Sequence, residues 1–358
     1  GLAKAWEDKG YFVRPDYPDW FDTNDGFYFL AQMNLGAPYT DYPKYAGEAL
    51  RMGLNHVQVW GQFTDLRYGC CGPYWQPSPR YGALEEFTKG IADAREMGVR
   101  MGFYFVHDRV DLYHPNGTHI YGFIDKDEYP PGTEFPDHDL WVKLQWVSDP
   151  AGKEFAYPLS DAQWDEYHKK IKAHRENPKR NKAPRKWHPV DLTDPDWWEY
   201  IRHWGVDKYA GDWGAAGIYN DVLATGSARV SYDPRKGHHG DSMGHGKADI
   251  ARAMVESARA KGFDDFFHLA EGCADIVHQW CAPANMGIYR FKTEMFRYSW
   301  PDAVIFEGTA GQGSRNMRRV RAAARPERDP TRGRGRGDPR CGRGAARRAR
   351  RVRRRDGA

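Results

Sequence analysis

The chain has 358 residues, with 53 Lys and Arg against 49 Asp and Glu and a formal net charge of +4. This average combines two segments of opposite charge. Residues 315–358 hold 18 Arg, no Lys and 4 acidic residues, which leaves residues 1–314 with 35 basic and 45 acidic residues. An acidic body argues against a nucleic-acid-binding surface on the folded part. No run approaches the roughly 18 apolar residues that a membrane span needs, so an integral membrane protein is excluded.

Short apolar runs alternate with helical stretches between residues 25 and 310, which predicts a parallel α/β architecture. Leu84, Phe87 and Ile91 lie on one helical face, and Gly98 is expected in the left-handed conformation that ends their helix. In chain order, the sequence up to this region predicts a strand at 27–32, a helix at 42–52, a strand at 56–60, the helix just described and a strand at 99–106.

A polar interval, residues 108–192, is too long for an ordinary connection and predicts an elaborated active-site loop or a small subdomain. Regular pattern resumes at Asp194, which is expected to cap a helix with Pro195 at its first position. After that helix, which runs to about Tyr209, we expect a strand at 217–222, a helix at 246–261, a strand at 266–270, a helix at 274–281, a strand at 287–291, a helix through Tyr298 and a strand at 303–307.

Seven strands before the basic tail predict the α/β fold class, as a (β/α)8 TIM-type barrel truncated after strand seven with a long insertion after strand three. A doubly wound sheet is the alternative, but the Gly-rich phosphate-binding fingerprints typical of it are absent. The expected domains are an N-terminal linker or the end of an upstream domain at 1–24, the barrel at 25–313, and a disordered tail at 314–358.

The tail is rich in Arg, Ala, Gly and Pro, all of which have GC-rich codons, and this composition indicates out-of-frame translation. A basic arm that binds nucleic acid is the other interpretation. The 5 cysteines form no paired framework, so a disulfide scaffold is not expected and the redox compartment stays open. The chain begins at Gly1 without a signal-like segment, so its location is left open as well.

Catalytic groups of such barrels stand at the carboxyl ends of the strands, where this sequence has Asp221 on the fourth strand and Glu271 on the fifth. Strands about 4.8 Å apart can bring two carboxylates to the separation that retaining glycosidases use. Helix capping or pairing with Arg is the structural alternative for these acids, and it is the favoured interpretation for Glu307. The residues expected to line a sugar site are Trp60, Gln62, His107, Asp108, Tyr219, Asn220, His238, His239, Asp275 and Trp280.

The segment 232–246 carries His238, His239, Asp233 and Asp241, which are donors suited to a metal. Their spacing matches no closed zinc pattern, and HExxH is absent. A Gly-rich loop that presents His to ligand hydroxyls and a plain surface loop are the other interpretations. No metal or cofactor is therefore predicted for the site.

Three segments resemble successive motifs of the domain-of-unknown-function family 6259, bacterial barrel proteins similar to glycoside hydrolases. The segments are Tyr219-Asn220-Asp221, Ser231-Tyr232-Asp233-Pro234 with Gly237-His238-His239, and Ala270-Glu271-Gly272. Gly217 to Asp221 also resembles the nucleophile strand of the α-amylase and endo-α-N-acetylgalactosaminidase barrels. The resemblance covers about 25–310 and implies Asp221 as nucleophile and Glu271 as acid/base. Tyr219, where α-amylases have Arg, and Cys273-Ala274, where family members have an acid, depart from the pattern.

The predicted function is a retaining glycoside hydrolase acting on α-linked sugars, with a carbohydrate as its partner. Aromatic residues make up 15% of the chain, which fits rings that stack on sugars as well as rings that fill a large core. A non-catalytic carbohydrate-binding barrel and a metal-dependent hydrolase built on the 233–245 loop are the alternatives. The sugar, its linkage and the oligomeric state stay open.

Overall fold

The structure is a computed structural model, and it describes residues 7–9, 17–63, 75–111, 161–176, 187–225, 243–272, 274, 276–285, 305–308 and 317–320. The chain divides into two compact units, Gly1–Ala322 and Ala323–Ala358. The second unit lies outside the described residues. In the described part of the chain, no helix is both long and apolar enough to span a bilayer.

A closed barrel of strands organises the first unit, with neighbours in the order β1-β10-β9-β8-β7-β6-β3-β2. All neighbours are parallel except β10, which runs antiparallel to both β1 and β9. The predicted α/β class with a parallel barrel sheet is therefore confirmed. The strands are β1 Gly26–Leu30, β2 His56–Val59, β3 Arg100–Val106, β6 Gly217–Ala224, β7 Phe267–Gly272, β8 Ala282–Asn285, β9 Ile305–Gly308 and β10 Met317–Val320.

The structure differs from the prediction in the last third of the barrel. The sixth strand is Ala282–Asn285, whereas the predicted position 287–291 lies outside the described residues, and 276–280 forms turns in place of a helix. Met317–Val320 belongs to the segment predicted to be disordered, yet it forms β10. The physical reason is that the edges of β1 and β9 present backbone N–H and C=O groups, which an extended segment pairs with whatever its side chains.

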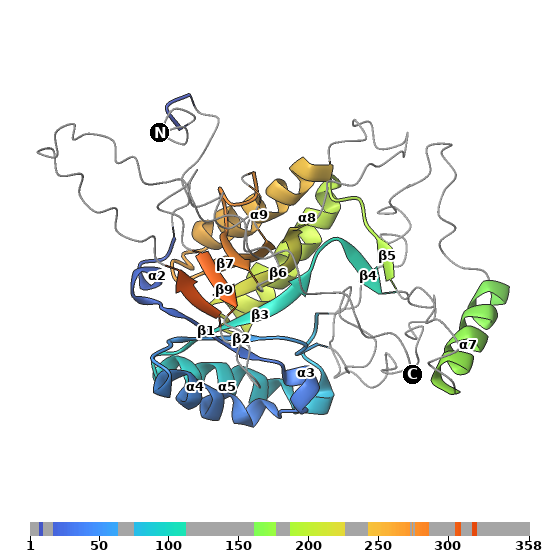
Figure 1. Cartoon of the computed structure of the whole chain (residues 1–358), viewed down its shortest axis with the longest axis horizontal. Coiled ribbons are helices and arrows are strands. Elements are labelled where there is room, and N and C mark those ends of the chain that lie inside the picture. The colour runs from blue at the N-terminus through green and yellow to red at the C-terminus, as the bar shows by residue number, and fades with distance from the viewer. Residues whose placement is uncertain are drawn as a thin grey trace, which may run out of the picture. The chain divides into compact units, whose positions relative to one another are not determined.

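Helices cover the outside of the barrel in two groups (Figure 1). α4 and α5 lie against each other, with α4 on β1 and β2 and α5 on β3. α8 and α9 also lie against each other and both contact η4, and here α9 contacts β7 and η4 contacts β6. The helical elements are α2 Trp20–Thr23, α3 Gln32–Leu35, η1 Tyr39–Asp41, α4 Tyr42–Arg51, η2 Pro79–Tyr81, α5 Leu84–Glu96, α7 Asp161–Glu176, α8 Pro195–Arg202, the π-helical η4 His203–Asp212 and α9 Met243–Ala260.

Two predicted helix ends are confirmed. Gly98 follows α5 with a φ of 83°, in the left-handed region that suits glycine. The Asp194 side chain accepts a hydrogen bond from the N–H of Asp196 at 3.0 Å and caps α8. Within the polar interval 108–192, the described residues form α7 and a two-stranded antiparallel sheet of β4 Arg109–Asp111 and β5 Trp187–Pro189.

The inside of the barrel is filled by side chains that alternate along each strand with side chains facing the helices. Gly102 and Gly217 face inward, because an added Cβ at either position would overlap Phe267. The Phe267 ring lies 4.5 Å from the ring of His56, which is fully buried at the start of β2. The two glycines thus make room for one large ring, and the amino-terminal half of the barrel is a packed core.

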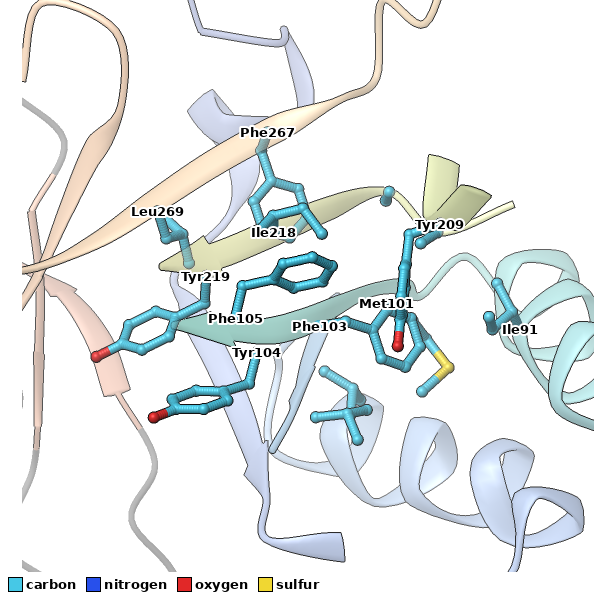
Figure 2. Packing of buried hydrophobic residues seen from close by; sticks show 14 of the residues in the cluster. Ile91, Met101, Phe103, Tyr104, Phe105, Tyr209, Ile218, Tyr219, Phe267 and Leu269 are labelled. Carbon is cyan, nitrogen blue, oxygen red and sulfur yellow. The ribbon is translucent and has the colours of Figure 1, made fainter. Parts of the chain in front are cut away.

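The opposite face of the same strands packs against the helices. Phe103 and Phe105 of β3 lie 5.2 Å and 5.1 Å from the ring of Tyr209 in η4. Figure 2 shows part of this packing together with Tyr104 and Tyr219, whose rings lie side by side with both hydroxyl groups directed the same way. The alternation along β3 thus separates a ring that faces the inside of the barrel from rings that anchor the helix layer.

Candidate active site

Two carboxylates stand at the carboxyl ends of neighbouring strands. Asn220 pairs with Ala270 in the register of β6 and β7, so Asp221 and Glu271 come next on the two strands. The backbone N–H of Val222 donates a hydrogen bond to Glu271 Oε2 at 3.0 Å. Since Val222 directly follows Asp221, this bond holds Glu271 Oε2 within about 5.5 Å of the Asp221 Cα atom. Both acidic residues are half-buried.

The strand β6 is irregular at this point. Ala224 pairs with Gly272, so the three residues from Asp221 to Leu223 lie opposite Glu271 alone. Val222 has a φ of 55°, and among the described residues it is the one non-glycine residue with a positive φ. For a β-branched side chain this conformation costs about 1–3 kcal/mol. A bulge of this kind re-aims groups beside an active site, and here it turns the Val222 N–H toward Glu271.

Tyr104 of β3 contacts the first carboxylate directly. Its hydroxyl donates a hydrogen bond to Asp221 Oδ2 at 2.6 Å, a short distance typical of a bond to a charged acceptor. The register pairs Tyr104 with Tyr219 and Val106 with Asp221. Asp221 follows Tyr219 by two residues on the same face of β6, so the Tyr104 side chain extends toward the carboxyl end of the barrel to meet it. Sequence pattern does not single out Tyr104, because it lies within an apolar run and only strand pairing brings it to Asp221.

Four aromatic rings form a belt along the inside of the barrel from β1 to β6. The Phe29 ring lies 5.3 Å from Trp60, Trp60 lies 5.0 Å from Tyr104, and Tyr104 lies 6.0 Å from Tyr219 with an interplanar angle of 22°. The structure therefore brings two of the predicted sugar-site residues, Trp60 and Tyr219, to the carboxylate-bearing face. Since Asp221 bonds to one ring of the belt, the belt and the carboxylates form one continuous site.

Asn220 and Gln62, both predicted to line the sugar site, lie elsewhere. The Asn220 side chain is fully buried, and its Nδ2 atom lies 2.8 Å from His268 Nε2. Gln62 is also fully buried and donates from Nε2 to the Tyr104 carbonyl at 3.1 Å and the Tyr209 hydroxyl at 3.2 Å. Adjacent residues on a strand point to opposite faces, so Asn220 turns away from the face that carries Asp221. Both amides hold the scaffold together, and Gln62 fixes the backbone of Tyr104.

For three further predicted residues the described contacts involve the backbone or a hydrophobic cluster, and their place in a sugar site stays a prediction. His107 is fully buried, and its carbonyl accepts a hydrogen bond from Trp197 Nε1 at 2.8 Å. Asp108 is buried, and its carbonyl accepts from the backbone N–H of Val190 at 3.3 Å. Trp280 is half-buried and packs against a small cluster that includes Leu223, Ala224, Ala251, Ala270, Val277 and Cys281.

The remaining predicted residues, His238, His239 and Asp275, lie outside the described residues, as do Asp233 and Asp241 of the candidate metal loop. The side chain of Glu307 is likewise not described. Within the part of the chain that is described, no group of three or more His, Cys, Asp or Glu residues is arranged to hold a metal ion. The metal-site interpretation of 233–245 therefore stays a prediction.

Two buried histidines support the strands that carry the site. Burial lowers the pKa of His268 to about 3 and that of His278 to about 4. His278 Nε2 lies 3.0 Å from the carbonyl oxygen of Gly272, and Nδ1 lies 3.0 Å from that of Cys281. A neutral ring has one N–H and donates to one of these two carbonyls, so it lies between the end of β7, one residue after Glu271, and the start of β8. Sequence analysis missed this residue, and its position among turn residues offers no signal for it.

No family model matches this chain, and no curated protein matches its sequence. Similar solved structures include a Paenibacillus sp. cycloisomaltooligosaccharide glucanotransferase complexed with cycloisomaltoheptaose (7% identity, TM-score 0.48), covering 81% of this chain and 39% of that one. They also include a maltogenic amylase from S. marinus (13% identity, TM-score 0.47), covering 78% of this chain and 41% of that one. A third is the cyclic α-maltosyl-(1→6)-maltose hydrolase from Arthrobacter globiformis (15% identity, TM-score 0.44), covering 76% of this chain and 56% of that one. This chain thus spans less than two thirds of their length, and its function has to be inferred from its own site.

Proposed function

We propose that this chain is a retaining glycoside hydrolase acting on α-linked sugars, with Asp221 as the nucleophile and Glu271 as the acid and base. The observation that carries the proposal is the 3.0 Å hydrogen bond from the Val222 N–H to the Glu271 carboxylate. It ties one acid to the residue that follows the other, at the end of the barrel where such enzymes act. Two carboxylates on adjacent strands are the groups that cleavage with retention requires.

The hydrogen bonds of the two acids suit different roles. Oδ2 of Asp221 accepts from the Tyr104 hydroxyl, so we assign attack on the anomeric carbon to Oδ1. As the bond between Oδ1 and the sugar forms, Glu271 gives its proton to the leaving glycosidic oxygen. Glu271 then takes a proton from water, whose oxygen displaces Asp221 and releases a sugar of unchanged anomeric configuration. Fixing one oxygen of each acid orients the other toward the substrate.

The aromatic belt supports a carbohydrate as the substrate. Trp60 is half-buried on the inward face beside the buried Tyr104, which bonds to Asp221, and an accessible ring face packs well against the C–H face of a pyranose. Acidic side chains next to rings suit an uncharged, hydroxyl-rich ligand better than a phosphate or a nucleic acid, because like charges repel. No step of this reaction calls for a metal or an organic cofactor.

Hydrolysis of aryl α-glycosides by the purified full chain tests the proposal. Asp221→Ala and Glu271→Ala should each lower kcat by about 10³-fold or more while the fold is retained. Asp93→Asn is the matched control, because Asp93 is a partly exposed acid paired with Lys89 on α5. Wild-type turnover followed by NMR should release the α-anomer first.

Azide rescue separates the two roles. It should give an α-glycosyl azide with Glu271→Ala, where the covalent intermediate still forms, and a β-glycosyl azide with Asp221→Ala, where azide replaces the nucleophile. Full activity of Asp221→Ala, initial release of the β-anomer, or sugar binding without any wild-type hydrolysis would each contradict the proposal.

A further inference from the structure

We infer that Lys247 of α9 is a positioning residue that fixes Asp221 and Glu271 through the bulge of β6, an inference that rests on the proposed function. The Lys247 ammonium donates hydrogen bonds to the carbonyl oxygens of Val222 at 3.3 Å and Thr225 at 3.0 Å. These two carbonyls lie on either side of the end of β6. Lys247 thus joins the irregular segment after Asp221 to the helix α9, 25 residues further along the chain.

Val222 is held at both of its backbone polar groups. Its N–H donates to the Glu271 carboxylate, and its carbonyl accepts from Lys247. The positive φ of Val222 is unfavourable for a β-branched residue, so the conformation persists only because its surroundings impose it. The ammonium is a charged donor that constrains both sides of the bulge, with a long contact of 3.3 Å to the Val222 carbonyl and a shorter one of 3.0 Å to the Thr225 carbonyl.

The base of Lys247 is itself fixed. The preceding residue, Gly246, lies so close to Leu192 that an added Cβ would overlap the Leu192 carbonyl. Ile250 and Met254, one and two turns further along α9, are buried in the core. The first turn of α9 is therefore seated on the backbone that precedes α8. A half-buried lysine on such a support loses little further freedom when its ammonium binds the two carbonyls.

A second set of contacts leads from Lys247 to the same acid. Gly272, which directly follows Glu271, has a φ of 90° and packs so closely on Ala224 and Thr225 that an added Cβ would overlap both. Thr225 is buried, and its carbonyl is the nearer acceptor of the Lys247 ammonium. The contacts through Val222 therefore end at Glu271 itself, and those through Thr225 end at Gly272, the next residue. Loss of the ammonium should let the bulge shift relative to β7.

The kinetic experiment compares Lys247→Met, which keeps the apolar stem, with Lys247→Arg, which keeps the charge and the donors. Lys247→Met should lower kcat by about 100-fold with KM unchanged, since a displacement of about 1 Å has an effect of this size on catalysis. Lys247→Arg should restore most of kcat. Lys89→Met is the matched control, because Lys89 is an exposed lysine paired with Asp93 on α5. A wild-type kcat for Lys247→Met would overturn the inference.

An NMR experiment tests the same inference without activity. In protein labelled with 15N-valine, the Val222 amide is assigned by the signal lost in Val222→Ile. Glu271→Gln should move this signal in the wild-type background and leave it unmoved, or move it much less, in the Lys247→Met background. Equal movement in both backgrounds would overturn the inference, even if the wild type proves to have no glycosidase activity and the proposed function fails. If Lys247→Met does not fold, Lys247→Gln takes its place in both experiments.

Discussion

The hydroxyl of Tyr104 donates a hydrogen bond to Asp221 Oδ2 across 2.6 Å. The two residues are 117 positions apart in sequence, but their strands are adjacent in the barrel. One side chain therefore serves two purposes in the site. Its ring belongs to the aromatic belt, and its hydroxyl orients the carboxylate to which we assign nucleophilic attack. Because ring and hydroxyl can be separated by a single substitution, their contributions can be measured independently.

Tyr104→Phe should lower kcat by about 10- to 100-fold, because it removes one charge-assisted hydrogen bond worth about 1.5–3 kcal/mol and keeps the ring. Tyr28→Phe is the control, since it also removes a hydroxyl that donates to a carboxylate, that of Glu48 at 2.8 Å on the α4 side. Steady-state kinetics on an aryl α-glycoside provide the measurement. Equal kcat values for the two variants would argue against a role for the Tyr104 hydroxyl.

In strands an alanine variant is usually more stable than a glycine variant, and at Val222 we expect the opposite order of stability. At a φ of 55° alanine keeps the steric penalty of the left-handed region, whereas glycine does not. Val222→Gly should therefore be more stable than Val222→Ala by about 1 kcal/mol, as measured by urea unfolding. At Val59, a buried position in β2 without a positive φ, Val59→Ala should be the more stable variant. The same order at both positions would mean that Val222 is not strained.

Stability should fall as the pH is lowered from 6.5 toward 4. Burial lowers the pKa of His56 and His268 to about 3 and that of His278 to about 4, against 6.5 in the unfolded chain. In this window the unfolded state binds protons that the folded state does not. Each histidine therefore removes up to about 1.4 kcal/mol of unfolding free energy per pH unit as the pH falls, and its contribution is fully present above pH 6.5.

His56→Phe provides the measurement for one of these histidines, because it removes the titrating group from among the rings of Trp20, Phe27 and Phe267 and keeps a ring there. The free energy of unfolding, measured with urea at several pH values between 7 and 4.5, should depend less steeply on pH in His56→Phe than in the wild type. The difference should correspond to the uptake of about one proton fewer on unfolding. An unchanged slope would mean that His56 does not take up a proton when the protein unfolds.

Two glycines in the middle of helices should respond to alanine in opposite ways. At Gly47 of α4 the nearest atom to an added Cβ is the Met97 Cε at 3.7 Å, so Gly47→Ala should raise stability by about 0.5–1 kcal/mol. At Gly90 of α5 an added Cβ would lie 2.6 Å from the Tyr39 carbonyl oxygen, so Gly90→Ala should lower stability by about 1–3 kcal/mol. The free energies of unfolding of both variants and the wild type, measured with urea at pH 7, test this. A Gly90→Ala variant more stable than the wild type would contradict the packing of α5 on η1.

The α/β class and the first five strands of the barrel were predictable because their signals are local. Hydrophobic periodicity marked α5, and a capping Asp followed by Pro marked the start of α8. The later strands were harder to place, because β8 and β10 are short and lack a distinctive apolar pattern. For β10 the backbone groups of the neighbouring strands decide the pairing, and no residue pattern within Met317–Val320 records them.

The sequence by itself determined which strands end in carboxylates, because position along a strand follows from local pattern, and so Asp221 and Glu271 could be named. Only the tertiary structure decided how these acids are held. Register across β3, β6 and β7 brings Tyr104 and the Val222 N–H to them, and the alternation of faces turns Asn220 away. The physical reason is that a hydrogen bond depends on distances of a few tenths of an ångström between distant segments, which packing sets.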